Sequence, residues 1–563
     1  MLFRLNEVPF SAYGSFMAIT EIVPSDQIQG IYIKSVRGGD EKAGLIFRIE
    51  ATCEDKIVPY TYQVSATLLQ MNSDKGYLAI SFQEPDVIRI NGEGIGVRLV
   101  VVNDTYDYAV PMGDIIELNS YSKERRYALH ACQGNMQMEA PWEGSRCRSI
   151  AFDLSPSLDE GQIDLLIHEY AVVPRAGFKD SASIGTKEHF ESFLAHTRGC
   201  SSQFETAREL AAYITWSCVV EPEGYLPRRA MYMSKNWMTN IWSWDHCFNA
   251  MALIEGEPQL AWDQFMIFFD RQDESGMLAD LMNDKYALWN GCKPPIHGWT
   301  LAWMMRRTDY VTVERMKEIY EPMVRWTNFW FEHRDTQKSG IPAYNHGNDS
   351  GWDNSTIFHL GVPLQSPDLC AFLVLQMDVL GEIALQLGLI GEAESWRQRS
   401  EELLQATLAH FWNGEAFLAK LTESNQAHVG DSLQLFLPVV LGHRLPEAVR
   451  ERLVEGLKQS GRFLTEHGFA TESVRSEFYQ ADGYWRGPIW APSTLLIYEG
   501  LKACGELDFA MDIAERFCKM AAQSGMAENY DAITGEGLRD RAFTWTSSVF
   551  LILANELYRH ENK

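Results

Sequence analysis

The hydrophobic residues of this chain change their period partway along the sequence, and that change limits the fold more than any other feature. In the first part, short segments such as 30–36 and 44–52 alternate apolar and polar residues and are rich in β-branched and aromatic side chains. In the second part, apolar residues recur at helical spacing to the end of the chain. The first pattern is typical of half-buried strands and the second of amphipathic helices. We therefore predict an N-terminal antiparallel β-sandwich domain at 1–175, a linker at 176–200 and a mainly α domain at 201–563.

The helical part is predicted to consist of helical hairpins. Segment 366–389 begins with Ser366 as a cap and Pro367 at the first helical position, and a second helical segment follows at once at 391–412. At roughly 30 residues per helix and loop, the helical part holds about twelve helices. Twelve helices in hairpins can close as an (α/α)6 toroid, and an open solenoid of helix pairs is the alternative. Long loops rich in Trp, Asp, Glu, Asn and His favour the toroid, because they are expected to face one shared cleft.

Charge and cysteine usage exclude several classes of partner. The net charge of −27 argues against nucleic acid, which requires basic patches. Ten cysteines are scattered without a CxxC pair, which indicates buried thiols in a reducing compartment and no zinc site. No signal-peptide pattern opens the chain, and no apolar run of about 20 residues occurs. We expect a cytoplasmic protein with no membrane partner.

Five stretches of the helical part combine tryptophan with carboxylates and amides. Aromatic residues make up 12% of the chain, and tryptophans cluster in or near these stretches, where flat rings can stack on sugar rings. Taken singly, each stretch has a structural explanation, such as a packed Trp beside a capping Asp or an Arg stacked on aromatic rings. Five of them at corresponding helix ends favour a carbohydrate site. They are 235–250, 270–284 with 293–300, 345–355, 483–493 and 526–548.

Two carboxylates in these loops are candidates for glycosidic bond cleavage. That reaction usually needs one carboxyl group to protonate the leaving oxygen and a second to activate water or attack directly. Asp353 follows Trp352, whose ring is expected to limit solvation, as a general acid requires. Glu528 is followed by Asn529 and Tyr530, which are suited to orienting it and a water molecule. The separation of the two carboxylates does not follow from sequence, so retention and inversion both remain open at this point.

Five motifs then carry a family resemblance over the helical part. They are SGWDNS (350–355), GMLAD (276–280), PPIHGW (294–299), YWRGPIW (484–490) and ENYD (528–531), the last followed by a Gly-rich turn and FTWTSS. In their order along the chain they resemble the (α/α)6 glycosidases of glycoside hydrolase family 63, of the bacterial glucosidase and mannosylglycerate hydrolase type, and the related family 37 trehalases. The resemblance implies inverting hydrolysis of α-glycosides, with Asp353 as the general acid and Glu528 as the general base. The N-terminal sandwich is similar to the extra β domain that some members carry.

The same resemblance implies a sugar-binding subsite. Asp349 and Asn354 would orient the acid or bind hydroxyl groups, although relatives often carry Glu at the position of Asp349. No cofactor or metal is expected, because two carboxylates and water suffice, and no DxDxDG-type calcium loop is present. The residues that would line the subsite are Trp242, Trp244, Asp245, Gln272, Trp299, Arg486, Trp490 and Trp545.

The predicted function is an exo-acting α-glucosidase on a small α-glucoside or oligosaccharide. An epimerase or isomerase on the same toroid is one alternative, and it would use His246, His297 or His346 as acid and base. An inverting phosphorylase would need a phosphate site in place of Glu528. A non-catalytic carbohydrate-binding protein would keep the tryptophans but have no reason to keep both carboxylates.

Overall fold

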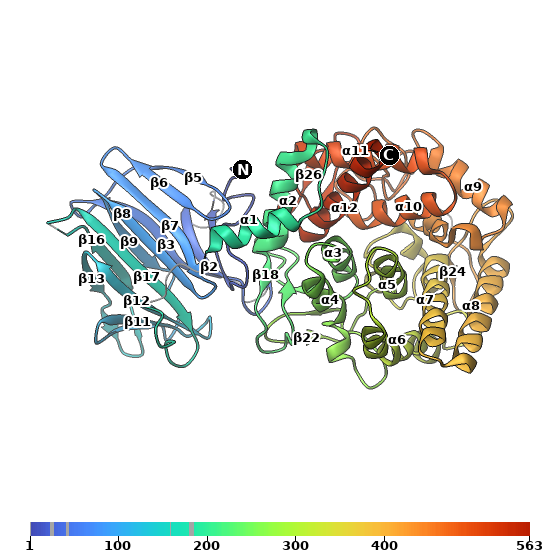
Figure 1. Cartoon of the computed structure of the whole chain (residues 1–563), viewed down its shortest axis with the longest axis horizontal. Helices are drawn as coiled ribbons and strands as arrows, with labels where there is room; N and C mark the ends of the chain where they lie inside the picture. The colour runs from blue at the N-terminus through green and yellow to red at the C-terminus, as the bar shows by residue number, and fades with distance from the viewer. Residues whose placement is uncertain are drawn as a thin grey trace.

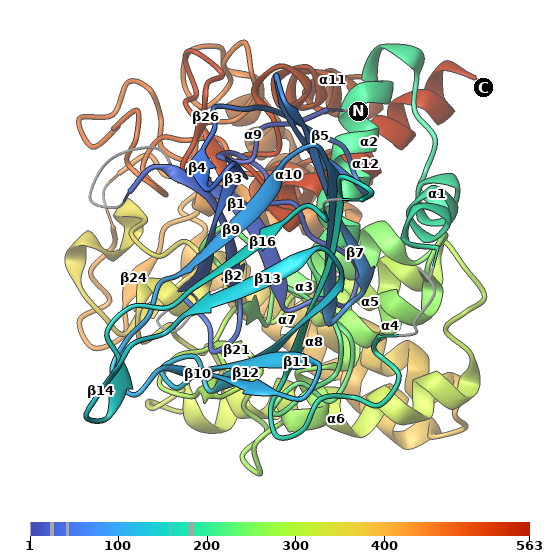
Figure 2. The same ribbon diagram turned by 90° about the vertical axis from the view of Figure 1, so that its left-hand side faces the viewer.

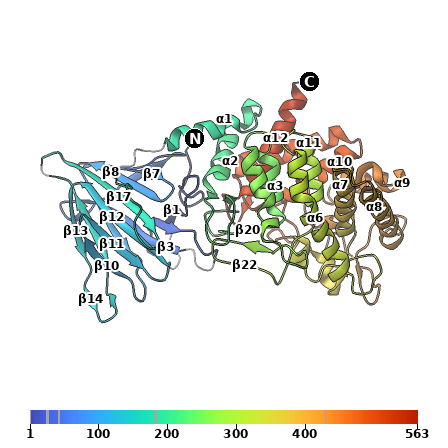
Figure 3. The same ribbon diagram turned by 60° about the horizontal axis from the view of Figure 1, so that its bottom comes forward.

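The computed structural model describes residues 2–22, 28–40, 44–157, 159–179, 185–428 and 430–562. Its β sheets and its helices form two parts that lie side by side, with the short helix α1 (Thr186–His196) between them (Figure 1). Both parts remain distinct when the molecule is tilted (Figure 3). Within the described residues, no helix is both long and apolar enough to cross a bilayer.

The N-terminal part contains two antiparallel sheets, which Figure 2 shows in front of the helices. One sheet has the order β1 (Met17–Ile22), β2 (Gly30–Ser35), β3 (Gly44–Cys53), β9 (Gly96–Val101), β16 (Ala151–Ser155) and β13 (Asn135–Glu139), with β4 (Lys56–Ile57) on β3. The other has the order β10 (Tyr108–Met112), β11 (Ile115–Ser120), β12 (Arg125–Gln133), β17 (Gln162–Tyr170), β8 (Val87–Glu93), β7 (Gly76–Glu84), β6 (Leu69–Ser73) and β5 (Thr61–Val64). A small hairpin adds β14 (Trp142–Glu143) and β15 (Arg146–Cys147).

The two sheets pack face to face around an apolar core. Phe47 of β3 and Tyr127 of β12 are both buried and meet edge to face, with ring centroids 5.5 Å apart. Such edge-to-face contacts between large rings stabilise a core beyond the area that they bury. This arrangement confirms the predicted antiparallel β-sandwich.

Within the described residues, six inner helices of the second part form a closed ring. In ring order they are α3 (Asp245–Leu253), α5 (His297–Met305), α7 (Pro367–Gln386), η5 (Leu433–Arg444), α10 (Ala491–Ala503) and α12 (Thr544–Glu561), and α12 packs against α3 again. Each outer helix packs against an inner one; the outer helices are α2 (Glu205–Ser217), α4 (Pro258–Met266), α6 (Val313–His333), α8 (Ile390–Phe411), α9 (Glu447–Lys458) and α11 (Leu507–Ser524). An open solenoid would leave its two ends apart, so the closed ring confirms the predicted (α/α)6 toroid.

Burial follows the pattern of each helix. Inner helix α7 is buried on nearly all sides, whereas outer helix α11 buries one face that includes Ile513 and Phe517. A helix that is apolar all round must lie inside a protein, and an amphipathic one covers its surface. As predicted, α7 begins with Pro367 at its first position, although the Ser366 side chain bonds Asp368 instead of capping the helix.

The connection between β2 and β3 joins the two parts of the molecule. Gly38 donates a backbone hydrogen bond to the Asp284 carboxylate at 2.7 Å, and Thr239 donates one to Asp40 at 2.8 Å. The β-sandwich therefore contacts the loop that precedes α3. Of the predicted linker 176–200, residues 180–184 lie outside the described residues, and α1 occupies part of the remainder. The division at 1–175, 176–200 and 201–563 stays a proposal.

Short strand pairs and 3-10 turns shape the loops of the ring. The 3-10 turns are η1 (Ser202–Phe204), η2 (Phe269–Arg271), η3 (Gly347–Ser350) and η4 (Thr356–Leu360). The strands are β18 (Val219–Val220), β19 (Ala230–Met231), β20 (Ile241–Trp242), β21 (Leu281–Met282), β22 (Ala287–Leu288), β23 (Leu364–Gln365), β24 (Lys420–Leu421), β25 (Asn529–Tyr530) and β26 (Gly537–Leu538).

Candidate active site

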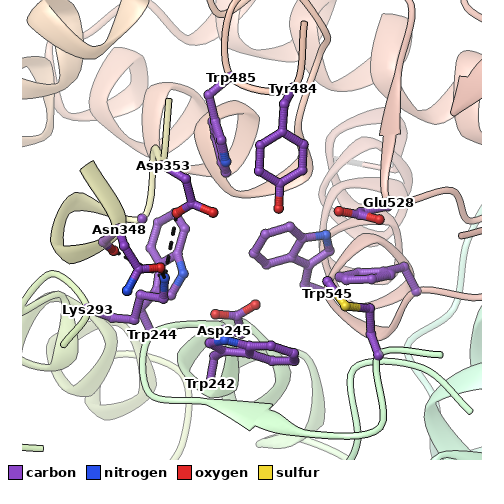
Figure 4. Close-up of a pocket in the computed structure, with 13 residues that line it drawn as sticks. Trp242, Trp244, Asp245, Lys293, Asn348, Asp353, Tyr484, Trp485, Glu528 and Trp545 are labelled. Carbon is purple, nitrogen blue, oxygen red and sulfur yellow. Dashed lines mark hydrogen bonds and ion pairs between the residues drawn. The ribbon is translucent and has the colours of Figure 1, made fainter. Parts of the chain in front are cut away.

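A cavity of about 120 Å³ opens at the N-terminal ends of the inner helices (Figure 4). Its walls come from the loops before α3, α5, α7, α10 and α12, because inner helices that run the same way bring their N-termini to one end of the ring. One buried water needs roughly 10–15 Å³ by this measure, so the cavity holds on the order of ten water-sized groups, about one pyranose ring. The lining residues are Met238, Trp242, Trp244, Asp245, Lys293, Asn348, Gly351, Asp353, Tyr484, Trp485, Glu528, Phe543 and Trp545.

Half of the predicted site residues line this cavity. Asp353 and Glu528 lie on opposite sides of it, with Asp245 and Trp242 along a third side (Figure 4). Trp244 and Trp545 also belong to the wall. The other six, which lie elsewhere or behind the wall, are Gln272, Trp299, Asp349, Asn354, Arg486 and Trp490.

Gln272 and Trp299 are directed away from the cavity. The Gln272 amide donates to the carbonyls of Gly276 and Pro322 at 2.8 and 2.9 Å, so it stabilises the turn after α4. Trp299 lines a different cavity, beside Arg306 and towards the C-terminal end of α5. Trp299 lies in a matched motif and Gln272 shortly before one, but both side chains hold the scaffold.

Asp349 and Asn354 fix the loop that carries Asp353. The Asp349 carboxylate accepts backbone hydrogen bonds from Cys292 at 3.3 Å and from Asn345 at 3.0 Å. Asn354 accepts from the backbone N–H of Trp485 at 2.9 Å and donates to the carbonyl of Gly483 at 3.0 Å. These contacts attach the loop to its neighbours on both sides.

Stacked tryptophans support one wall. Trp490 lies behind Trp485, with the rings nearly parallel and their centroids 4.0 Å apart. Trp352 packs on the same ring at 4.8 Å and is buried. Arg486 donates to Gln480 at 3.0 Å and does not belong to the wall. The stack holds Trp485 rigidly at the cavity surface.

Asp353 lies beside a buried cation. Its carboxylate is 3.6 Å from the ammonium group of Lys293, and the Asp353 side chain is 35% exposed whereas that of Lys293 is 5% exposed. Lys293 also contacts Asp280 at 3.3 Å and donates to the Asn348 side chain at 2.5 Å. Burial alone would lower the pKa of Lys293, but Asp353 and Asp280 outweigh it and raise that pKa above its usual value. The neighbour that dominates the surroundings of Asp353 is therefore an ammonium group, and the Trp352 ring is packed into the stack.

Glu528 has the opposite surroundings. It is buried, and its backbone N–H donates to the carbonyl of Asp540 at 2.7 Å. Burial, followed by the charge of Asp540, raises the pKa of Glu528 to about 8, although Arg539 opposes the shift. Glu528 is therefore mostly protonated at pH 7 in the free protein, and it ionises as the pH rises through about 8.

Three buried polar atoms of the cavity wall have no hydrogen-bond partner among the described residues. They are one carboxylate oxygen each of Asp245 and Glu528 and the indole nitrogen of Trp545. Burial raises the pKa of Asp245 to about 8, although Lys293 opposes the shift. Because their residues line the cavity, these three atoms are available to the hydroxyl groups of a ligand.

Several wall residues were not predicted. Lys293 and Tyr484 stand inside or beside the quoted motifs, so the motifs could have indicated them. Met238 and Phe543 give no chemical signal, because an apolar residue near a helix end usually belongs to the core. Asn348 lies in the polar loop of Asp353, where one amide cannot be told from another by composition.

The histidines proposed for an epimerase are not arranged as an acid and base pair. None of His246, His297 and His346 is among the residues that line the cavity. Burial lowers the pKa of both His246 and His297 to about 3, so both are neutral near pH 7. The His346 ring accepts a hydrogen bond from the backbone of Asn348.

Two solved structures share this fold. A family 63 mannosylglycerate hydrolase from Thermus thermophilus, in complex with glucose, aligns with a TM-score of 0.53 at 17% identity, over 61% of this chain and 99% of its own. A bacterial glucoamylase complexed with acarbose aligns with a TM-score of 0.62 at 11% identity, over 99% of this chain and 94% of its own, and so covers both parts of the molecule. At these identities the structures show the fold alone.

Sequence comparison extends the match to the family. Mannosylglycerate hydrolase from Rubrobacter radiotolerans is 23% identical over 411 residues, which cover 55% of this chain and 89% of the relative. The family model for the mannosylglycerate hydrolase MGH1-like glycoside hydrolase domain matches residues 238–546, which include the loops of the cavity. These matches confirm the resemblance to family 63, and the chain belongs to the MGH1-like family of glycoside hydrolases.

Proposed function

We propose that this protein is an exo-acting, inverting α-glycoside hydrolase in which Asp353 is the general acid and Glu528 the general base. The observation that carries the proposal is the pair of carboxylates on opposite sides of one small cavity (Figure 4). In an inverting mechanism the acid protonates the leaving oxygen while the base activates a water on the other face of the sugar. A non-catalytic sugar-binding protein would have no need for both groups.

The cavity supports a substrate with a single sugar ring at the non-reducing end. Its volume suits one pyranose, and its wall combines tryptophan rings with polar atoms that lack partners among the described residues. Trp242, Trp244 and Trp545 would contact the sugar, and Asp245 would accept hydrogen bonds from its hydroxyl groups. Gln272, Trp299, Asp349, Asn354, Arg486 and Trp490 would act from behind this wall, by holding the loops.

The aglycone is proposed to be small. The names of related proteins contain mannosylglycerate, so a glycerate conjugate is a candidate beside α-linked disaccharides. We favour an α-glucoside or α-mannoside of this size, hydrolysed in the cytoplasm without a cofactor.

A hydrolysis screen with anomer detection tests the function. Purified protein is incubated with α-glucosylglycerate, α-mannosylglycerate, glucosylglycerol and α-linked disaccharides, and released sugar is followed by proton NMR. We expect release from at least one compound, with the β-anomer formed first because water attacks from the face opposite to the leaving group. A first-formed α-anomer would contradict inversion, and interconversion of sugars without hydrolysis would favour an isomerase.

Gly351 offers a test of the cavity wall. It has φ +74°, and a Cβ atom there would lie 2.5 Å from the Trp244 ring. We expect Gly351→Ala to lower kcat/KM by about tenfold or more, because displacement of a wall ring misplaces the bound sugar. The matched control is Gly388→Ala, with φ +77° and no atom within 4 Å of the added carbon.

The control separates backbone strain from the displacement of the ring. Both variants should lose about 1–2 kcal/mol of folding stability from the left-handed backbone, seen as a lower Tm. Only Gly351→Ala should lose activity measured well below its Tm. Equal activity in the two variants would show that the Trp244 wall does not contact the substrate.

A further inference from the structure

The strand β2 of the sandwich is buried on both faces where it meets the helical part. Its pairing with β3 shifts register between Ile33 and Lys34, and such irregularities re-aim side chains. Lys34 is buried, and its ammonium group donates to the backbone carbonyl of Asn236 in the loop before α3. A sandwich residue therefore reaches into the loops that surround the cavity.

Further hydrogen bonds lead from Asn236 to the loop that carries Glu528. The Asn236 side chain donates to the Asp540 carboxylate at 2.9 Å, and the same carboxylate oxygen accepts from the backbone of Ala542 at 2.9 Å. The backbone carbonyl of Asp540 in turn accepts from Glu528 at 2.7 Å. Lys34, Asn236, Asp540 and Glu528 thus form a chain of hydrogen-bonded residues that leads from the β-sandwich to the cavity.

We propose that Lys34 and Asp540 are positioning residues that hold Glu528 in place and set the pH at which it ionises. The proposal deepens the proposed function, since it rests on Glu528 being the base. Asp540 acts through its backbone carbonyl on the position of Glu528 and through its charge on the ionisation of Glu528. Lys34 contributes a positive charge that favours the ionised form of the buried Asp540 carboxylate.

The charges around each group support this arrangement. Glu528 faces Asp540, Arg539, Asp353 and Tyr484. Burial raises the pKa of Asp540, and Asn236, Ser234, Ala542 and Lys34 oppose that shift. Burial lowers the pKa of Lys34 to about 8, although Asp540, Asp40 and Cys218 oppose the shift, so Lys34 carries its charge below that pH. Hydrogen bonds from neutral donors oppose the burial of Asp540 most strongly, and Lys34 adds a positive charge that also favours the ionised form.

Loss of either positioning residue should have the same consequence. Without Lys34, the buried Asp540 carboxylate loses a positive charge that favours its ionised form, and it takes up a proton more readily. In both Lys34→Met and Asp540→Asn the repulsion between Asp540 and Glu528 then disappears, and Glu528 ionises at lower pH. The two changes therefore act through one interaction and should not add.

The experiment measures kcat/KM against pH, which reports the ionisation of the free enzyme. In the unmodified protein we expect activity to rise with pH along a limb near pH 8, as Glu528 becomes the base. In Lys34→Met and in Asp540→Asn the limb should move to lower pH by about one unit or more, a tenfold gain in the ionised fraction below the limb. The double variant should show no further shift.

Lys235→Met is the matched control. Lys235 is also a buried lysine at the same junction, but it donates to Ser15 at 2.6 Å and to Ser11 at 3.0 Å, and Asp540 is not among the groups that shift its pKa. The control should lose stability, as Lys34→Met does, while its limb stays in place. Asp540→Asn keeps the acceptor oxygen for Asn236 and Ala542, so it carries the test if Lys34→Met does not fold.

The outcomes separate this inference from the proposed function. If the rise of kcat/KM near pH 8 persists in Glu528→Gln, Glu528 is not the base and both proposals fail. The same holds if kcat/KM of the unmodified protein falls with pH in this range instead of rising. If the limb is lost in Glu528→Gln but does not move in Asp540→Asn, the positioning inference alone is overturned. A limb that moves equally in Lys235→Met would also overturn it, because the shift would then follow from general destabilisation.

Discussion

Replacing Asp353 by asparagine is expected to lower kcat for an unactivated α-glycoside by about 10³-fold or more, while the protein still folds. Asparagine has nearly the same shape but no proton to give to the leaving oxygen. The Asp353 side chain is partly exposed, and its carboxylate contacts the ammonium group of Lys293 at 3.6 Å. When the carboxylate is lost, that buried ammonium group still has other partners. Lys293 keeps Asp280 and Asn348. The measurement is steady-state kinetics together with Tm.

The identity of the acid can be tested with the leaving group. Fluoride departs without protonation, so an α-glycosyl fluoride should be hydrolysed by Asp353→Asn nearly as fast as by the unmodified protein. The control is Asp349→Asn, since Asp349 is a buried aspartate of the same loop that accepts backbone hydrogen bonds. Its loss should cost stability, with no selective recovery on the fluoride. Poor turnover of the fluoride by Asp353→Asn would show that Asp353 is not the acid.

Replacing Glu528 by glutamine should reduce turnover by a similar factor of about 10³ or more. Unlike Asp353→Asn, this variant should not recover on the glycosyl fluoride. A better leaving group should not restore activity, because the missing step is activation of water. Azide needs no base and should restore turnover by forming the β-glycosyl azide. Recovery of Glu528→Gln on the glycosyl fluoride would mean that Glu528 is the acid, a role that its high pKa would also permit.

Glu472→Gln is the control for this variant. Glu472 is a fully buried glutamate that accepts from Thr356 at 2.7 Å and from Ser476 at 2.6 Å, and it does not belong to the cavity wall. Its loss should lower Tm without a specific loss of turnover and without rescue by azide. A fall in activity as large as that of Glu528→Gln would point to loop distortion as the cause in both.

The fold could be predicted from the sequence because period and length are local properties. Alternation in β3 and helical spacing in α11 arise from which side of each element is buried, and both patterns can be read without knowing the partners. Closure of the ring followed from the long loops and was confirmed by the contact of α12 with α3. The inner helix η5 is irregular, with non-helical backbone at Gly442 near its end and Pro438 inside it.

The site was predictable only in part. Trp299 stands in a matching motif and Gln272 close to one, yet the Trp299 side chain lines another cavity and the Gln272 side chain bonds a turn. Which way a loop residue faces depends on how neighbouring loops pack, and spacing along the chain does not carry that information. Lys293 stands beside a motif, but its contact with Asp353 joins two separate loops, so that contact is known only from the structure.

The sequence by itself determined the two-part fold and nominated both carboxylates, because burial patterns and motif order lie along the chain. The tertiary structure alone decided what surrounds each carboxylate: an ammonium group beside Asp353, and a buried aspartate tied to a β-sandwich lysine beside Glu528. Electrostatic interactions depend on distance and solvation, and these groups are far apart in sequence but adjacent in the fold. The surroundings of both carboxylates are therefore properties of the closed ring and its sandwich together.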